Sequence, residues 1–335
     1  MTARPSLLSE RPLRLDLADP RGDVLADVMS LGLLRNVLYR QIEARAPWGL
    51  AVSKRDRALL YVIARGRAYL EIEGEKPRIL EQGHAAFLPR PVRHTLRDDP
   101  SSPAVEVCDG KHMMPSGATR RVGGRGEQTS IVAAFFELTP TTPTLLDRRP
   151  GVVVLSDHAT AGDPVVKATI AVLLAELASP GPATTIIQQR LADVLVVQAL
   201  RTLTKHSECS KHRPSSLGAL SDPRIHRALS LMHAHVDHDW TVAELATKVG
   251  ISRSGFAARF TELVGEPPLQ YLARWRVARA AELLRTTDDA VGEIAAKVGY
   301  ESAPSFNKAF KRWQGASPGE YRRASRGPLP TLEAV

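Results

Sequence analysis

The sequence predicts an α+β protein with two parts, a β-rich N-terminal domain that carries a helical hairpin and an all-helical C-terminal domain. Three observations predict this division: short β-rich runs separated by glycines, helical periodicity from residue 163 onward, and a repeat in the last third of the chain. At 335 residues and 43% hydrophobic composition, the chain has enough apolar material for two cores.

The N-terminal part, residues 1–160, contains short apolar runs typical of strands in a sandwich or barrel. Glycines at positions 66, 74 and 83 separate the first runs, which are residues 59–63, 68–72 and 85–88, and a further strand is expected at 130–136. The glycine-rich, basic segment 115–126 has no apolar periodicity, so we expect it to be a loop.

Residues 161–206 show apolar side chains at helical spacing, interrupted by the Ser-Pro-Gly-Pro sequence at 179–182. This pattern predicts a helical hairpin. The second helix is apolar on more than one face, and we therefore expect it to join two subunits of a homodimer. The polar stretch 207–221 is predicted to be a linker, residues 222–325 a helical domain, and 326–335 a tail.

An internal repeat defines the helical domain. Residues Glu244 to Gly250 recur as Glu293 to Gly299, forty-nine positions later by subtraction. The repeat then continues at an offset of fifty, where Phe256, Phe260, Gly265, Pro268 and Tyr271 recur as Phe306, Phe310, Gly315, Pro318 and Tyr321. The chain therefore contains two copies of one supersecondary unit.

Each copy has the local signals of a helix, a tight turn and a second helix. Thr241 and Glu244 form a capping-box pattern, Gly250 suits a left-handed turn, and Ser252 can cap the second helix. Such a helix-turn-helix places its second helix in the DNA major groove. Residues 269–286 are predicted to form one helix of about 27 Å, which would hold the two units nearly one DNA turn apart. Double-stranded DNA is the expected partner, consistent with the formal charge of +9.

The joint pattern resembles the AraC/XylS family of bacterial transcription regulators. It comprises Ile294-Ala295, Gly299-Tyr300, Ser305-Phe306, Phe310-Lys311-Arg312 and Ser317-Pro318. Upstream, Gly83, Pro89 and His94 resemble the second motif of a cupin-type sensor domain, with Pro91 where that motif has its last glycine. The resemblance implies a cupin-like β-barrel, RNA polymerase as a further partner, activation rather than repression, and control by a small-molecule effector or an oxidant.

The residues expected to contact DNA lie on the second helix of each unit and just beyond the last one. The family commonly has an Arg where this chain has Ala258, so the first recognition helix is expected to read bases weakly. The complete predicted set is Arg253, Ser254, Ala257, Ala258, Ala303, Pro304, Asn307, Lys308, Lys311, Arg312 and Arg322. Lys297, Arg323 and Arg326 add further basic side chains that suit phosphate contacts.

For the sensor site, Cys108 lies near Lys111 and His112, which could favour its reactive thiolate, although a buried, inert thiol is the simpler interpretation. Candidates to line an effector cavity are Trp48, Tyr61, Tyr69, Phe87 and His94; an ordinary core is the alternative for the aromatic residues. The cluster His233, His235 and His238 invites a metal hypothesis, but solvated polar residues are the favoured interpretation.

Two other functions compete with a regulator. A cupin-type enzyme with an accessory helical domain would need metal ligands, but residues 58–74 contain no His and the chain has no P-loop, G-x-S-x-G or H-E-x-x-H motif. We therefore predict no enzymatic activity, no metal and no cofactor. A nonspecific nucleic-acid-binding protein would not need two recognition helices at duplex spacing. Two cysteines, no signal sequence and no run of about 18 apolar residues predict a cytoplasmic protein without a membrane span.

Overall fold

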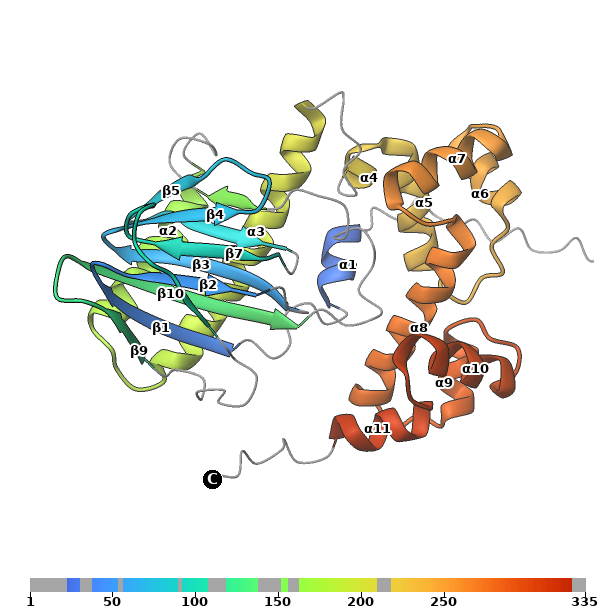
Figure 1. Ribbon diagram of the computed structural model, residues 1–335. Helices are drawn as coiled ribbons and strands as arrows, with labels where there is room; N and C mark the ends of the chain where they lie inside the picture. Colours follow the sequence, from blue (N-terminus) through green and yellow to red (C-terminus); the bar gives the residue numbers. More distant parts are fainter. Residues whose placement is uncertain are drawn as a thin grey trace, which may run out of the picture.

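The computed structural model describes residues 23–30, 38–53, 57–89, 92–107, 119–137, 152–155, 163–209 and 218–326. Figure 1 shows a β-rich lobe, a helical lobe, and helix α1 (Val24–Ser30) between them. The predicted α+β class and the order of the two parts along the chain are confirmed.

Two sheets form the β-rich lobe. The six-stranded sheet has the order β11 (Val153–Leu155), β6 (Ala85–Leu88), β3 (Arg57–Arg65), β10 (Gln128–Glu137), β1 (Leu38–Arg45), β9 (Thr119–Gly123). The five-stranded sheet has the order β5 (Arg78–Glu81), β4 (Arg67–Ile72), β7 (His94–Arg97), β2 (Gly49–Val52), β8 (Val105–Glu106). The pairs β1–β9 and β2–β8 are parallel, and the other neighbours are antiparallel.

The six-stranded sheet is buried on both faces because its strands alternate two apolar surfaces. In β3, Tyr61 and Ile63 pack into a core shared with the five-stranded sheet, whereas Leu60 and Val62 pack on the opposite face. That second face is covered by the helical hairpin α2 (Pro164–Ala178) and α3 (Thr184–Cys209). Because successive residues of a strand point to opposite faces, these strands contribute to one core between the sheets and to another beneath the hairpin.

Three expectations need correction. Within the described residues no strand pair joins the two sheets, so the lobe is a sandwich of mixed sheets rather than a closed barrel. Part of the predicted loop 115–126 is strand β9, which pairs in parallel with β1 from Gln41↔Thr119 to Arg45↔Gly123. Backbone hydrogen bonds hold this edge strand whatever its side chains are, and its side chains are exposed or half-buried, so its sequence shows no apolar periodicity. Helix α3 also continues to Cys209, past the predicted boundary at 206.

The helical lobe contains α4 (Gly218–Ser221), α5 (Pro223–Ala234), α6 (Val242–Val249), α7 (Arg253–Val264), α8 (Pro268–Thr286), α9 (Val291–Lys297), α10 (Ala303–Gln314) and α11 (Pro318–Arg326). Helix α8 connects the two halves of this lobe (Figure 1). The predicted helix 269–286 is confirmed with a start one residue earlier, where Pro268 takes the first helical position.

Candidate nucleic-acid interface

The first helix-turn-helix unit consists of α6 and α7. The Thr241 hydroxyl accepts a hydrogen bond from the backbone N–H of Glu244 at 3.1 Å, and Gly250 ends α6 in the left-handed region at φ 73°. Ser252 caps α7 by accepting from the N–H of Gly255 at 3.2 Å. The predicted caps and turn are therefore confirmed.

The second unit consists of α9 and α10, with the turn at Gly299, where φ is 82°. Ser302 accepts from the N–H of Ser305 at 3.4 Å, and Gly315 ends α10 as Gly265 ends α7. At the start of α9, the Glu293 carboxylate accepts from the N–H of Ala290 at 3.0 Å. The first unit uses the hydroxyl half of the capping box, and the second unit uses the carboxylate half.

Both second helices bury a phenylalanine pair and expose the opposite face. Phe256 and Phe260 of α7 lie 5.6 Å apart between ring centroids, and the corresponding rings of α10 lie 5.5 Å apart. Of the predicted contact residues on these helices, Ala257 is half-buried; those that are exposed are Arg253, Ser254, Ala258, Ala303, Pro304, Asn307, Lys308, Lys311 and Arg312. The predicted DNA-contacting side chains on α7 and α10 are thus available on the surface.

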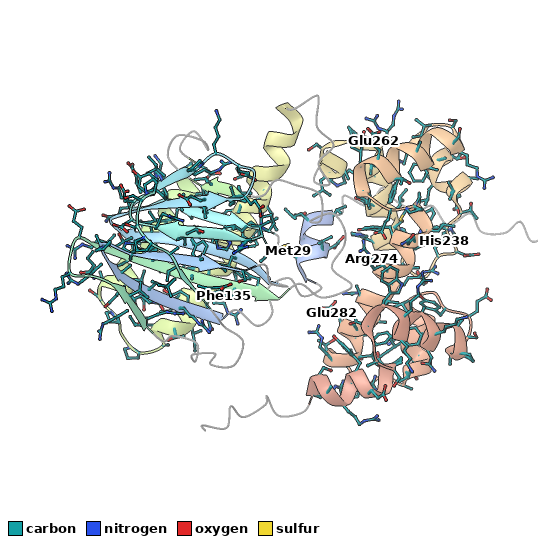
Figure 2. All side chains as sticks on the ribbon, viewed as in Figure 1. Met29, Phe135, His238, Glu262, Arg274 and Glu282 are labelled. Atoms are coloured by element: carbon teal, nitrogen blue, oxygen red, sulfur yellow. The ribbon has the colours of Figure 1, made fainter. Side chains whose placement is uncertain are left out.

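Helix α8 and its neighbours hold the two units against each other. Arg274 of α8, which Figure 2 labels, forms a buried ion pair with Glu266. Its guanidinium lies 5.8 Å from the ring centroid of Trp313. Arg276 donates to the carbonyls of Val236 and His238 at 2.9 and 2.8 Å. Contacts from α8 therefore reach both units, which limits how freely one recognition helix can turn relative to the other.

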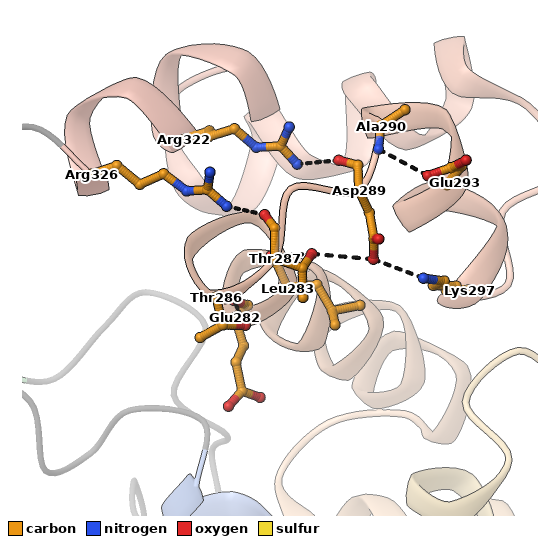
Figure 3. Close-up of polar contacts among 10 residues, drawn as sticks. All are labelled: Glu282, Leu283, Thr286, Thr287, Asp289, Ala290, Glu293, Lys297, Arg322 and Arg326. Carbon is orange, nitrogen blue, oxygen red and sulfur yellow. Dashed lines mark hydrogen bonds and ion pairs between the residues drawn. The ribbon is translucent and has the colours of Figure 1, made fainter.

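The connection between α8 and α9 is held by basic side chains that were expected to face phosphates (Figure 3). Arg322 donates to the carbonyl of Asp289 at 2.5 Å, and Lys297 lies 2.7 Å from the Asp289 carboxylate. Arg326 contacts the Thr287 carbonyl and, at 2.5 Å, the Asp288 carboxylate. The hydrogen bond from Lys297 lowers the pKa of Asp289 and so keeps the pair ionised. Arg322 is half-buried by this packing, whereas Lys311 and Arg312 of α10 are exposed.

Comparison with known proteins identifies both parts of the chain. The Cupin family matches residues 23–205, and the Helix-turn-helix domain family matches residues 245–324. A putative AraC-like transcription regulator of Streptomyces lividans is 34% identical over 307 residues, which cover 90% of this chain and 98% of the relative. The chain belongs to the AraC-like transcription regulators. This AraC-like regulator is also 33% identical to one from Streptomyces antibioticus, over 92% and 100% of the two chains.

A more distant relative of this AraC-like regulator spans nearly the whole chain. The RCS-specific HTH-type transcriptional activator RclR of Escherichia coli strain K12 is 25% identical over 312 residues, which cover 92% of this chain and all of the relative. Along this chain the cupin match precedes the helix-turn-helix match, and the latter spans residues of both helix-turn-helix units.

The residues predicted to line one effector cavity do not lie together. Trp48, Tyr61 and His94 are buried in the core between the sheets, whereas Phe87 packs on the other face, against Phe136. Tyr69 is half-exposed on β4. Cys108 lies outside the described residues. A set chosen by residue type alone could not reveal this separation, because the face that each strand residue occupies depends on sheet pairing.

His94 and Tyr61 form a buried polar pair in the AraC-like regulator. The Tyr61 hydroxyl lies 2.9 Å from Nε2 of His94, and Nδ1 of the same ring lies 2.8 Å from the Val92 carbonyl. Because a carbonyl only accepts, Nδ1 carries the proton and Nε2 accepts from Tyr61. Burial lowers the pKa of His94, which favours this neutral ring.

A narrow cavity of about 30 Å³ lies beside this pair between the sheets. Its walls are mainly apolar, but Arg40 and Arg120 also line it, and the Arg40 guanidinium lies 5.5 Å from the ring centroid of Phe135. Arg40 was not among the predicted effector residues, and Arg120 lies in the basic segment that was expected to be a loop. For Arg40 a signal existed: it alternates with Ile42 and Ala44, which places a charged side chain on the inward face of β1.

His233 is not the solvated residue that its cluster suggested. Its side chain is only 1% exposed and stacks on Trp275, with 3.6 Å between ring centroids. Nδ1 lies 3.1 Å from the Asp27 carboxylate, and Nε2 lies 2.8 Å from the Tyr271 hydroxyl. His235 and His238 remain half-exposed, and within the described residues no three His, Cys, Asp or Glu side chains gather as a metal site.

Proposed function

We propose that this AraC-like regulator is a cytoplasmic, homodimeric transcription activator that reads two successive major grooves with α7 and α10. An effector or oxidant acting on the cupin domain would control it, and RNA polymerase would be the second macromolecular partner. The observation that carries the proposal is the exposure of two equivalent recognition helices, each capped and turned in the same way, at the two sides of α8. The activator role is supported by the similarity to RclR, a transcriptional activator.

In-vitro selection from random duplex DNA tests the DNA-binding proposal, followed by anisotropy titration of the selected site and a scrambled duplex at several salt concentrations. We expect two sequence blocks about ten base pairs apart and binding at least about a thousandfold tighter than to the scrambled control. Equal affinity for every duplex with a steep salt dependence would instead indicate a nonspecific nucleic-acid-binding protein.

The homodimer is supported by an exposed apolar face on the helical hairpin. Of the large hydrophobic side chains that are exposed in the described residues, most belong to α2 or α3: Val165, Val172, Ile186, Ile187 and Val194. Such a concentration is costly in water and is typical of a surface covered by another subunit. We expect Val194→Glu to shift the protein from dimer to monomer in analytical ultracentrifugation. Ile79→Glu, at an exposed apolar residue on β5, is the matched control and should leave the dimer intact.

The effector proposal is supported by the cavity between the sheets. Its apolar walls and two arginines suit a small molecule that has an apolar body and an acidic group. Because the cavity measures only about 30 Å³, an effector must widen it, and this movement would carry the signal to the rest of the lobe. Arg40→Met should weaken any effector response of DNA binding while leaving effector-free binding unchanged. A response that survives this substitution would place the effector elsewhere.

A further inference from the structure

The two recognition helices are equivalent in structure but differ in the chemistry of their outward faces. The buried phenylalanines, the serine caps and the terminal glycines of α7 and α10 correspond at an offset of fifty residues. At the same offset, four outward positions differ in kind: Ala257, Ala258, Thr261 and Glu262 of α7 stand where α10 has Asn307, Lys308, Lys311 and Arg312.

The outward face of α10 can recognise bases and phosphates through hydrogen bonds and charge. Asn307 and Lys308 are exposed, and their side chains can bond adenine and guanine edges in the major groove. Lys311 and Arg312, one turn later, are exposed as well and can neutralise phosphates.

After its first turn, the same face of α7 has no long side chain that is free to donate hydrogen bonds to DNA. Arg259, the only arginine of the helix besides Arg253, instead donates a hydrogen bond from Nε to the Asp222 carboxylate at 2.5 Å. Glu262 places a negative charge where α10 carries Arg312, and this charge repels phosphate. The middle of α7 therefore cannot read bases as α10 does.

Small side chains leave a hollow on this side of α7. Its volume is about 790 Å³, and its mainly apolar lining includes Val242, Ala257, Ala258, Thr261 and Leu269. Ala257 and Ala258, which line this hollow, lie one helical turn after Arg253 and Ser254, two of the residues expected to contact DNA. The only apolar group on the major-groove edge of a base pair is the C5 methyl of thymine.

We propose that α7 recognises its block of the operator through thymine methyl groups, which contact the methyl groups of Ala257 and Ala258. The block read by α7 is then thymine-dependent, while the block read by α10 is specified by the hydrogen bonds of Asn307 and Lys308. This inference rests on the proposed function, since it requires sequence-specific binding through both helices.

The test replaces single thymines by deoxyuridine in the selected operator, which removes the methyl group and leaves base pairing intact. Lys308→Ala first assigns the blocks, because it should relax specificity only in the block read by α10. In the other block, deoxyuridine at a contacted position should weaken binding by the full-length protein about fourfold, the value expected for one buried methyl-sized group.

A double-mutant cycle then assigns the contact to the alanine. With Ala258→Gly, the difference between thymine and deoxyuridine should fall toward onefold, because one partner of the apolar contact is gone. Lys308→Ala at the equivalent position of α10 is the matched control and should leave the fourfold difference unchanged. The double variant Ala257→Asn with Ala258→Lys should abolish the thymine dependence and create a purine preference in that block.

The outcomes separate the inference from the proposed function. Specific binding in which every thymine of the α7 block tolerates deoxyuridine overturns the inference alone. Unchanged binding and specificity in the Asn/Lys double variant also overturns it, and indicates that this face of α7 meets a protein instead of DNA. Failure to select any site would overturn the proposed function and the inference together.

Discussion

The Asp27 carboxylate lies 3.1 Å from Nδ1 of His233, across the boundary between the two domains. Asp27 belongs to α1, which lies inside the region matched by the Cupin family, yet α1 packs against α5 of the helical lobe. The carboxylate only accepts, so Nδ1 carries the proton and Nε2 accepts from the Tyr271 hydroxyl. Burial raises the pKa of Tyr271 and keeps this hydroxyl protonated.

This relationship ties α1 to α5, the helix that precedes the first helix-turn-helix unit. Val24, Val28 and Met29 are buried in the same cluster as the α5 side chains, and Met29 lies between the lobes in Figure 2. The position of α1 is therefore tied to α5 by both apolar packing and a partly buried hydrogen bond.

Loss of the Asp27 acceptor should destabilise the protein. Asp27→Ala leaves the Nδ1–H of buried His233 without its carboxylate, at an expected cost of about 1–3 kcal/mol in the free energy of unfolding. Urea denaturation followed by tryptophan fluorescence measures the loss, since Trp275 stacks directly on His233. Asp27→Asn is the control, because its amide oxygen can still accept. Equal losses in the two variants would contradict the hydrogen-bond explanation.

Stability should decrease in mild acid because of two buried histidines. Burial lowers the pKa of His233 and of His94 below the ordinary value of 6.5, so the unfolded chain binds protons at a pH where the folded chain does not. For His233, hydrogen bonding to Asp27 opposes this shift and nearby His226 adds to it. The free energy of unfolding should thus fall as pH drops below about 6.5, by at most about 1.4 kcal/mol per pH unit for each residue.

The check is urea unfolding from pH 7.5 to 5.0 with His233→Gln and His94→Gln. Each substitution should reduce the change of the unfolding free energy with pH in the lobe that contains the residue, which is the helical lobe for His233 and the β-rich lobe for His94. This expectation holds whatever the substitution does to stability at neutral pH. An unchanged slope in both variants would mean that other groups cause the acid sensitivity.

The two turn glycines should differ in their tolerance of a side chain. Gly250 and Gly299 both have positive φ, so alanine costs about 1–2 kcal/mol at either position. At Gly250 a Cβ atom meets nothing within 4 Å, but at Gly299 it would lie 2.7 Å from the Arg276 guanidinium and 2.9 Å from Cα of Asp237. Gly299→Ala should therefore lower the thermal midpoint more than Gly250→Ala. A reversed order would show that the close approach of the two units relaxes at little cost.

Substituting Lys311 and Lys297 should affect the salt dependence of DNA binding differently. Lys311 is exposed on α10, whereas Lys297 is held by Asp289. Lys311→Ala should reduce the slope of log K against log salt by about one unit, and Lys297→Ala should change the slope much less. Anisotropy titration of the selected operator between 50 and 200 mM salt, a range that resolves such slopes, measures both variants. Equal reductions would mean that DNA displaces Asp289 from Lys297.

Local patterns in the sequence suffice to predict the double helix-turn-helix, the caps at Thr241, Ser252 and Ser302, and the turns at Gly250 and Gly299. These features depend on interactions within a few residues, which a single stretch of sequence contains in full. Repetition at a fixed offset also made the two units recognisable without any knowledge of their packing.

Tertiary packing sets which partners residues far apart in the chain meet. It paired β9 with β1, separated Phe87 from Tyr61, and brought His233 against Asp27, 206 positions away. It also turned Arg322 toward Asp289, although its spacing suggested a phosphate contact. A side chain's charge and period are local properties, but its burial and its hydrogen-bond partner depend on how whole sheets and helices pack, and no short pattern in the sequence encodes that packing.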